Sequence, residues 1–129
     1  MSRGKFNKYH AKKIKADGMT FDSKHEYRRW QELCEMQERG EIRDLERQVK
    51  FLLIPAQYEY TEKYSEKTGK RLKDKRRCLE QQVSYVADFA YKNRAGFDVI
   101  EDAKGRKTKD YIIKRKLMLH VHGIRVQEV

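Results

Sequence analysis

Two short apolar segments of this chain carry acidic residues where β-strands rarely have them. Asp88 lies within Tyr-Val-Ala-Asp-Phe, and Asp102 and Lys104 end the segment Val-Ile-Glu-Asp-Ala-Lys. Side chains alternate between the two faces of a strand, so Asp102 and Lys104 share one face and Glu101 lies on the other. Two carboxylates and a lysine brought together could hold a divalent cation and orient a water molecule for phosphodiester hydrolysis.

A simpler interpretation is that these residues are solvent-facing charges on an exposed sheet, which any single surface acid would fit. Asp88 argues against it, because aspartate is disfavoured in strands and is costly to bury without a partner. Glu26 leaves two alternatives open. Ser23 to Glu26 form a capping-box pattern, in which the carboxylate returns a hydrogen bond to the start of a helix, but a glutamate on that first turn could also point into the same cleft.

The composition predicts one small domain with a polyanionic partner. Of the 129 residues, 38% are apolar and 40% are charged, and the net charge is +11. A chain of this length holds one modest core, and nucleic acid is the commonest polyanionic partner of a small basic protein. No apolar run approaches the roughly 20 residues of a spanning helix, and the start of the chain lacks the apolar centre of a signal peptide. We therefore expect a cytoplasmic protein with no membrane partner.

The hydrophobic patterns predict the order helix, strand, strand, strand, helix, strand. Residues 1–20 are expected to form a basic flexible arm, and residues 21–129 a single domain. The expected elements are a helix over 23–39, a strand over 45–54 that continues past Pro55 as 58–60, strands over 83–91 and 98–104, a helix from 108 to 123 with Ile112, Ile113, Leu117 and Val121 facing inward, and a strand over 124–129. This order gives a mixed sheet flanked by helices, an α+β arrangement within the α/β class.

Basic residues concentrate in the arm, in the run 62–77, and around the second helix. We expect the run 62–77 to be the tip of a long antiparallel hairpin. Each cluster alone is typical of a solvated face, but a carboxylate site would repel DNA unless surrounding cations held the phosphates. Such contacts read the backbone rather than the base sequence. The residues predicted to bind DNA are Lys73, Lys75, Arg76, Arg77, Arg106, Lys107, Lys109 and Lys114.

Together these motifs resemble the PD-(D/E)XK nuclease superfamily, and more closely the small phage-encoded proteins described as Holliday-junction-resolvase-like. The resemblance runs from about Phe21 to Val129, and Ala87 stands where the motif has proline. Its sequence elements are Glu26 in Ser-Lys-x-Glu, the quartet Leu45-Glu46-Arg47-Gln48, Asp88 in Tyr-Val-Ala-Asp-Phe, and Asp102-Ala103-Lys104 leading through Gly105 to Thr108.

The resemblance implies an αβββαβ restriction-endonuclease-like core that depends on Mg²⁺ or Mn²⁺. It also implies roles for four residues: Asp88 and Asp102 as metal ligands, Lys104 as the catalytic lysine, and Glu26 as an auxiliary acid and metal ligand. The expected function is that of a Mg²⁺-dependent endodeoxyribonuclease selective for Holliday junctions or other branched DNA in phage recombination or replication, in the host cytoplasm. Symmetric cleavage of a junction needs two active sites, which implies a homodimer.

Two other functions stay open at this point. The chain could be a non-catalytic nucleic-acid-binding protein whose acids are structural, or a nuclease subunit that needs a partner protein.

Overall fold

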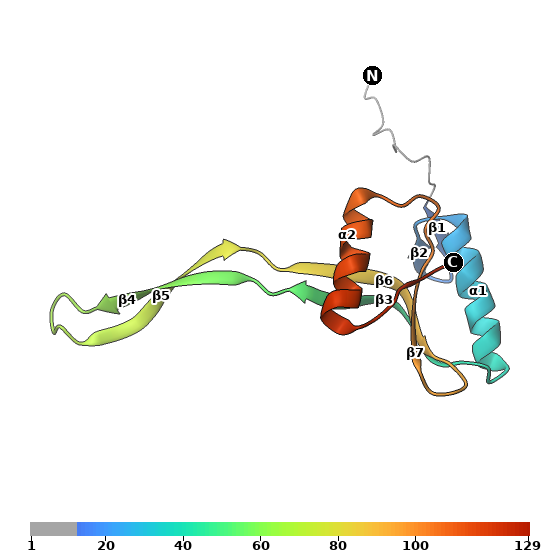
Figure 1. Ribbon diagram of the computed structural model, residues 1–129, viewed down its shortest axis with the longest axis horizontal. Helices are drawn as coiled ribbons and strands as arrows, with labels where there is room; N and C mark the ends of the chain where they lie inside the picture. Colours follow the sequence, from blue (N-terminus) through green and yellow to red (C-terminus); the bar gives the residue numbers. More distant parts are fainter. Residues whose placement is uncertain (1–12) are drawn as a thin grey trace, which may run out of the picture.

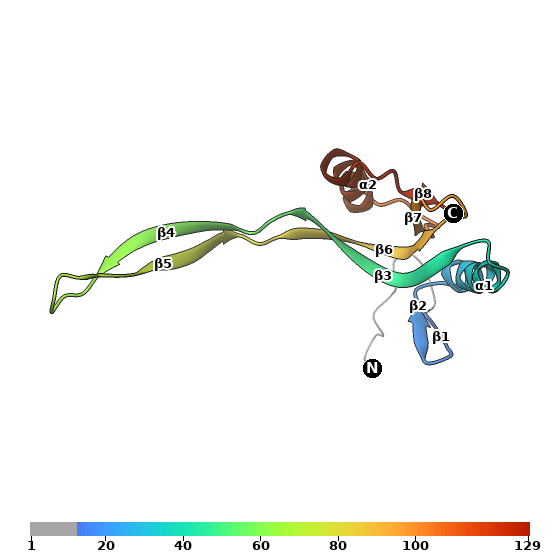
Figure 2. The ribbon, with the colours of Figure 1, turned by 90° about the horizontal axis from the view of Figure 1, so that it is seen from below.

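A four-stranded sheet lies between two helices in the computed structural model of the protein, which describes residues 13–129 (Figure 1). The strand order is β3 (Arg43–Ile54), β6 (Val83–Lys92), β7 (Asp98–Asp102) and β8 (Gln127–Glu128). The β3–β6 and β6–β7 pairs are antiparallel, and β8 is parallel to β7. Helices α1 (Lys24–Glu38) and α2 (Lys109–Leu117) lie on opposite faces (Figure 2). The predicted mixed α+β fold is confirmed.

Both helices begin where their capping signals predict. The Ser23 hydroxyl accepts a hydrogen bond from the Glu26 amide at 3.2 Å, and the Thr108 hydroxyl accepts one from the Tyr111 amide at 3.1 Å. The second helix continues from α2 through a π-helical turn, η1 (Met118–His122), and ends at Gly123 in the left-handed conformation. No helix in the described part of the chain is long and apolar enough to cross a membrane.

The buried stripe of the second helix differs from the predicted one. Tyr111 and Met118, seven positions apart, are buried, whereas Ile113 and Val121 are 58% and 46% exposed. The prediction that Ile113 and Val121 face inward is therefore wrong. In η1 the wider π turn rotates the residues after Met118 relative to an α-helical period, and Val121 leaves the buried stripe.

Apolar side chains form one cluster on each face of the sheet. The cluster beneath the second helix, the α2-side core, contains Leu53, Tyr85, Ala87, Ile100, Tyr111, Met118 and Val126. The cluster beneath the first helix, the α1-side core, contains Leu33, Ile42, Phe89 and Tyr91, with Trp30 packed against it. The Trp30 ring stacks on Phe89 with centroids 6.1 Å apart. Each helix is thus fixed to the sheet by its own core.

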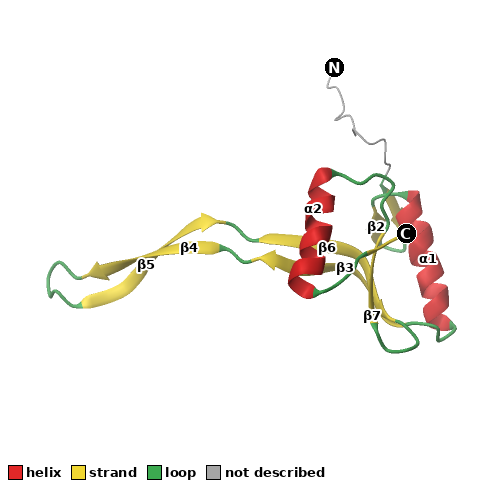
Figure 3. Cartoon of the chain, in the orientation of Figure 1, coloured by secondary structure: helices red, strands yellow, loops and turns green. Residues whose placement is uncertain are grey.

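A long two-stranded ribbon projects from this body (Figures 1 and 3). Strands β4 (Gln57–Tyr64) and β5 (Arg71–Glu80) pair with each other beyond Pro55, which lacks an N–H group and interrupts the β3–β6 ladder. We call residues 57–80 the β arm. The predicted long hairpin is confirmed, but its connecting turn is confined to residues 65–70. The basic residues expected at a tip over 62–77 therefore lie mostly on the strands.

The end of the segment predicted as a flexible arm is a hairpin. Strand β1 (Ile14–Ala16) pairs with β2 (Met19–Phe21), and the turn residues Asp17 and Gly18 have φ values of 53° and 74°. Positive φ at both central residues is typical of a tight hairpin turn. Residues 14–20 of the predicted arm thus belong to this hairpin, and residues 1–12 lie outside the described part.

Two strands are shorter than predicted. β7 ends at Asp102 rather than Lys104, because the Ala103 amide donates its hydrogen bond to the side chain of Asp88 at 2.9 Å instead of continuing a ladder. The C-terminal strand, expected over 124–129, is limited to Gln127–Glu128. The chain thus leaves the sheet between Asp102 and Lys104, which places Lys104 on a loop.

A buried ion pair joins α1 to β7. Arg29 donates from Nε and Nη2 to the two carboxylate oxygens of Glu101, both at 2.8 Å, and the Tyr91 hydroxyl donates to the same carboxylate. Glu101 is 2% exposed, so its charge is compensated by Arg29 rather than by water. The geometry is bidentate, the arrangement in which arginine binds carboxylates most strongly.

We predict that Arg29→Met lowers the free energy of unfolding by about 3–5 kcal/mol, because it leaves Glu101 buried without a counter-charge. Urea denaturation followed by circular dichroism measures this change. The double variant Arg29→Met/Glu101→Gln should recover part of the loss, since it removes the orphaned charge. A loss below about 1 kcal/mol in the single variant would contradict the assignment.

Candidate functional site

Asp88 and Asp102 are neighbours on adjacent strands. The β6–β7 register pairs Phe89 with Glu101, which sets Asp88 across the ladder from Asp102 at the end of β7. Both side chains are inside the protein, with exposed fractions of 8% for Asp88 and 0% for Asp102. Burial, and then the charge of Asp102, raise the pKa of Asp88 to about 8. Two carboxylates that share a dry site repel each other, which favours a proton or a cation between them.

Asp102 has one satisfied oxygen and one unsatisfied oxygen. The Tyr85 hydroxyl donates a hydrogen bond to Oδ2, whereas the buried Oδ1 accepts none within the described residues. Lys104 Nζ lies 3.2 Å from Oδ1 in an ion pair and 5.1 Å from the ring centroid of Tyr111. As the alternation of side chains predicts, Lys104 contacts Asp102. Glu101 is held by Arg29 on the α1 side and takes no part in this group.

Glu26 reaches the same group from the first turn of α1. Its Oε2 accepts a hydrogen bond from the Asp22 amide at 2.8 Å, so the carboxylate caps the helix start, one residue before the position that a capping box predicts. The side chain is 2% exposed, and burial is the main cause that raises its pKa. The charge of Asp102 also raises the Glu26 pKa, and the charge of Glu26 raises that of Asp88. A capping role and a place beside the carboxylates therefore coexist.

Strand β6 changes faces at Asp88. Tyr85 and Ala87 belong to the α2-side core, whereas Phe89 and Tyr91 belong to the α1-side core. All four have the same parity, and in a regular strand they would share one face. Because the change occurs at Asp88, this residue sits where the two cores meet. An acid there can be reached both from α1 and from the end of β7.

Gln48 lies beside Asp88, on the neighbouring strand β3. The register places it opposite Asp88, and its φ of 53° is in the left-handed region that residues other than glycine rarely adopt. The side-chain amide nitrogen of Gln48, Nε2, donates a hydrogen bond to Glu26 Oε1 at 3.3 Å. Strained backbone of this kind persists where the surrounding structure requires it and is common at functional sites. Gln48 is thus a site residue that hydrophobic patterning does not identify.

Arg47 fixes the other side of Glu26. Its guanidinium lies over the Phe21 ring at 4.0 Å and near the Trp30 ring at 5.6 Å, and it is 3.6 Å from Glu26 Oε1. It also donates to the Thr20 carbonyl at 2.9 Å. The alternation of β3 grouped Arg47 with apolar residues, and its position is explained by stacking on aromatic rings. The β1–β2 hairpin therefore contributes to holding Glu26.

The residues predicted to bind DNA fall into two separate groups. Four lie on β5 in the β arm: Lys73, Lys75, Arg76 and Arg77. The other four, Arg106, Lys107, Lys109 and Lys114, lie on the approach to α2 or on α2 itself. Of the second group, Lys107 pairs with Glu128 at 2.5 Å and Lys114 with Asp110 at 3.5 Å. The structure therefore does not bring the eight residues into one surface.

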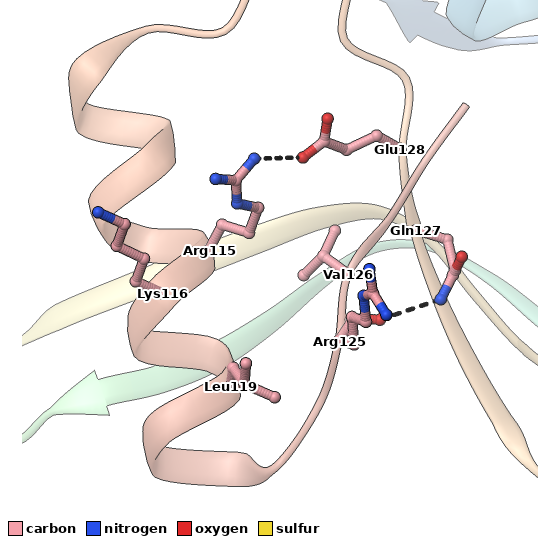
Figure 4. Close-up of a pocket in the computed structure, with 7 residues that line it drawn as sticks. All are labelled: Arg115, Lys116, Leu119, Arg125, Val126, Gln127 and Glu128. Carbon is pink, nitrogen blue, oxygen red and sulfur yellow. Dashed lines mark hydrogen bonds and ion pairs between the residues drawn. The ribbon is translucent and has the colours of Figure 1, made fainter.

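A cavity elsewhere in the described part of the chain does not coincide with this site. A cavity of about 720 Å³ lies between the second helix and the C-terminal strand (Figure 4), lined by Arg115, Lys116, Leu119, Arg125, Val126, Gln127 and Glu128. None of the carboxylates of the candidate site lines it. Inside it, Arg115 pairs with Glu128 at 2.7 Å. Lys107 and Arg115 together hold the pKa of Glu128 at about 2, well below its usual range.

The donor set of the site fits a hard divalent cation. Mg²⁺ and Mn²⁺ prefer oxygen ligands and accept one or two protein carboxylates with the remaining positions left to water and substrate. Asp102 Oδ1 is buried without a hydrogen bond, and the Asp88 carboxylate lies beside it. Within residues 13–129, however, no three His, Cys, Asp or Glu side chains are arranged together as a complete metal cluster. The residues present would therefore supply a sparse, carboxylate-based site.

Comparison with known proteins gives a family and no activity. Residues 6–127 match the family described as "Protein of unknown function (DUF1064)". Neither the curated proteins nor the solved structures contain a match. The function must therefore be argued from the chemistry of the residues themselves.

We predict that the metal-free protein loses stability as the pH rises from about 5.5 to 8.5. The pKa of Asp88 in the folded state, about 8, exceeds the value of about 3.9 in an unfolded chain. Its stabilising contribution is therefore complete below pH 4 and is lost as the pH passes through 8. Urea denaturation with a chelator at several pH values measures this loss. In Asp88→Asn, the fall in the free energy of unfolding between about pH 5.5 and 8.5 should be smaller by at least about 1 kcal/mol. An unchanged fall would contradict the raised pKa of Asp88.

A second prediction concerns the backbone at Gln48. Gln48→Gly should be more stable than Gln48→Ala by about 1 kcal/mol, because glycine adopts positive φ without a steric penalty. Val49 is the matched control, since it lies next along β3 and its φ is not positive. There the order should reverse, with Val49→Gly less stable than Val49→Ala. Thermal denaturation of the four variants tests both orders, and equal stability of the two Gln48 variants would argue against strain.

Proposed function

The chain belongs to the DUF1064 family of proteins of unknown function, and we propose that it is a metal-dependent DNA endonuclease. The observation that carries this proposal is the contact of buried Asp102 with Lys104 at 3.2 Å beside the buried Asp88. Two neighbouring buried acids with one lysine beside them are costly in a purely structural role, and a cation bound between them would remove that cost. The resemblance of the motifs to PD-(D/E)XK nucleases supports the same chemistry.

Each side chain has a role that follows from its contacts. Asp88 and Asp102 would hold the Mg²⁺ or Mn²⁺ ion, with Glu26 in reach as an auxiliary acid. Such an ion neutralises charge on the phosphate and lowers the pKa of a bound water. The Lys104 ammonium would offset the negative charge that develops on the phosphate in the transition state. Its alternative role is to orient the attacking water.

The aromatic residues keep these groups in position. The Tyr85 hydroxyl fixes one oxygen of Asp102, which leaves the other toward Lys104. The Tyr111 ring lies against the Lys104 ammonium and limits its movement. A site organised in this way by packed side chains needs little rearrangement during the reaction.

The preferred substrate is proposed to be branched DNA, including Holliday junctions. The chain has a net charge of +11, and contacts between cations and phosphates recognise the course of the backbone rather than its sequence. Cleavage of both strands at a junction would require two copies of the chain, so the proposal includes a homodimer on the substrate.

We predict that Asp102→Asn lowers cleavage by at least about 100-fold while DNA binding is retained, because the substitution removes a ligand charge without changing the shape of the side chain. Labelled junction, flap, single-stranded and linear DNA, each incubated with Mg²⁺, Mn²⁺ or a chelator, provide the measurement. Asp98→Asn is the matched control, since Asp98 begins the same strand but is exposed and paired with Lys92 at 3.1 Å.

Three outcomes separate the alternatives. Binding without cleavage on every substrate and metal would favour a non-catalytic nucleic-acid-binding protein. Cleavage only after addition of a cell extract would favour a subunit that needs a partner. Cleavage that persists in the chelator, or that Asp102→Asn leaves unchanged, would overturn the proposed site.

A further inference from the structure

We propose that the β arm is a second DNA-binding element that lies along the duplex flanking the cleavage site and contacts its backbone about one helical turn away. This inference rests on the proposed nuclease function and adds to it a length requirement for the substrate. It concerns a surface that the candidate site does not explain.

The β arm needs a partner to explain its exposure. Every residue of β4 and β5 is exposed, and within the described residues these strands pair only with each other. A solitary two-stranded hairpin is marginally stable in water, and exposed strand edges are usually covered or charged. The ribbon nevertheless extends far from the body in both views (Figures 1 and 2).

The charges of the β arm identify that partner as a polyanion. The β arm carries eight basic residues against five acidic ones, and its strand β5 carries five basic residues against two acidic ones. Lys73, Lys75 and Arg77 form no ion pair with any described residue, although Arg77 lies across from Glu59 in the β4–β5 register, whereas Arg71 is paired with Glu62 and Asp74. By contrast, the cations Lys104, Lys107 and Arg115 near the candidate site are engaged with carboxylates. The β arm thus offers cations that phosphates could bind without first breaking an ion pair with a carboxylate.

One side of the ribbon is aromatic as well as basic. In the β4–β5 register Tyr60 is paired with Arg76, and the Arg76 guanidinium lies 4.4 Å from the ring centroid of Tyr58. The Tyr58 and Tyr60 centroids are 6.4 Å apart, and Tyr60 is 63% exposed. Aromatic rings with an adjacent guanidinium suit the sugars and base edges of a groove. An exposed pair of this kind is costly to leave in water.

The dimensions of the ribbon favour duplex DNA of the B form. The major groove of B-DNA, about 12 Å wide, admits a two-stranded ribbon, whereas the major groove of an RNA helix is too narrow. Arg77 and Lys73 precede Asp88 by 11 and 15 residues. At about 3.3 Å per residue this separates them from the site by at most about 36–50 Å. One turn of B-DNA spans about 34–36 Å, so these cations would meet phosphates roughly 10–15 base pairs from the cut.

The test compares junctions whose arms are about 8 or about 25 base pairs long, with binding measured in a chelator so that no cleavage occurs. Wild-type protein should bind the long-armed junction at least about tenfold more tightly, and K73Q/K75Q/R77Q should lose this gain while binding the short-armed junction as wild type does. The slope of log affinity against log salt should fall by about 2–3 on long arms only. R28Q/R43Q/R94Q is the matched control: it removes three exposed charges that form no ion pair with a described residue, from α1, from the start of β3 and from the turn after β6, and it should keep the gain.

Footprinting of the wild-type protein on the long-armed junction gives a measurement that needs no variant. Protection of the backbone about 10–15 base pairs from the cut supports the inference, and protection confined to about 6 base pairs overturns it. Equal binding to short and long arms also overturns it, even if cleavage remains and the proposed function stands. A shift of K73Q/K75Q/R77Q from dimer to monomer with unchanged DNA affinity would make the β arm a protein interface instead. Equal affinity for an RNA duplex of the same length would contradict the groove argument.

Discussion

The buried position of Asp88, between the two cores of a thin sheet, constrains the rest of the molecule. A carboxylate there is costly, because burial and Asp102 both oppose its charge. The chain accommodates it by changing faces on β6, by holding Gln48 in a strained conformation opposite it, and by ending β7 so that the Ala103 amide can donate to it. Each of these is a local departure from a regular sheet, and together they place Asp88 across the ladder from Asp102.

The two consecutive acids of β7, Glu101 and Asp102, lie on opposite faces of the sheet and differ in how fully their charges are compensated. Glu101 points toward α1 and is fully engaged by Arg29 and Tyr91, whereas Asp102 points toward the second helix and retains an oxygen without a hydrogen bond. The first acid fixes a helix to the sheet through a compensated charge. The second is only partly compensated, by Lys104 at 3.2 Å. A structural acid is satisfied by its neighbours, and the incomplete satisfaction of Asp102 makes it a candidate site residue.

Much of this arrangement could be predicted from the sequence. The contact of Lys104 with Asp102 was predicted, although Lys104 lies on the loop after β7, and capping signals are enough to place Glu26 at the start of α1. Gln48 could not be found in this way, because a left-handed residue within a strand leaves the hydrophobic pattern unchanged. Val121 was misplaced because a π turn alters the helical period without any sequence signal. Local sequence patterns thus predict which face of a strand a residue lies on and where a helix begins. Distortions of the backbone, in contrast, depend on tertiary contacts.

The distribution of charge follows from the same division of roles. The chain is strongly basic, with a net charge of +11, yet the candidate site gathers acids, and nearby cations such as Lys104, Lys107 and Arg115 neutralise carboxylates. Attraction of a polyanion must then come from cations that are farther away, since a cation already paired with a carboxylate gains little from a phosphate. The projecting ribbon meets that electrostatic requirement without adding positive charge to the site itself.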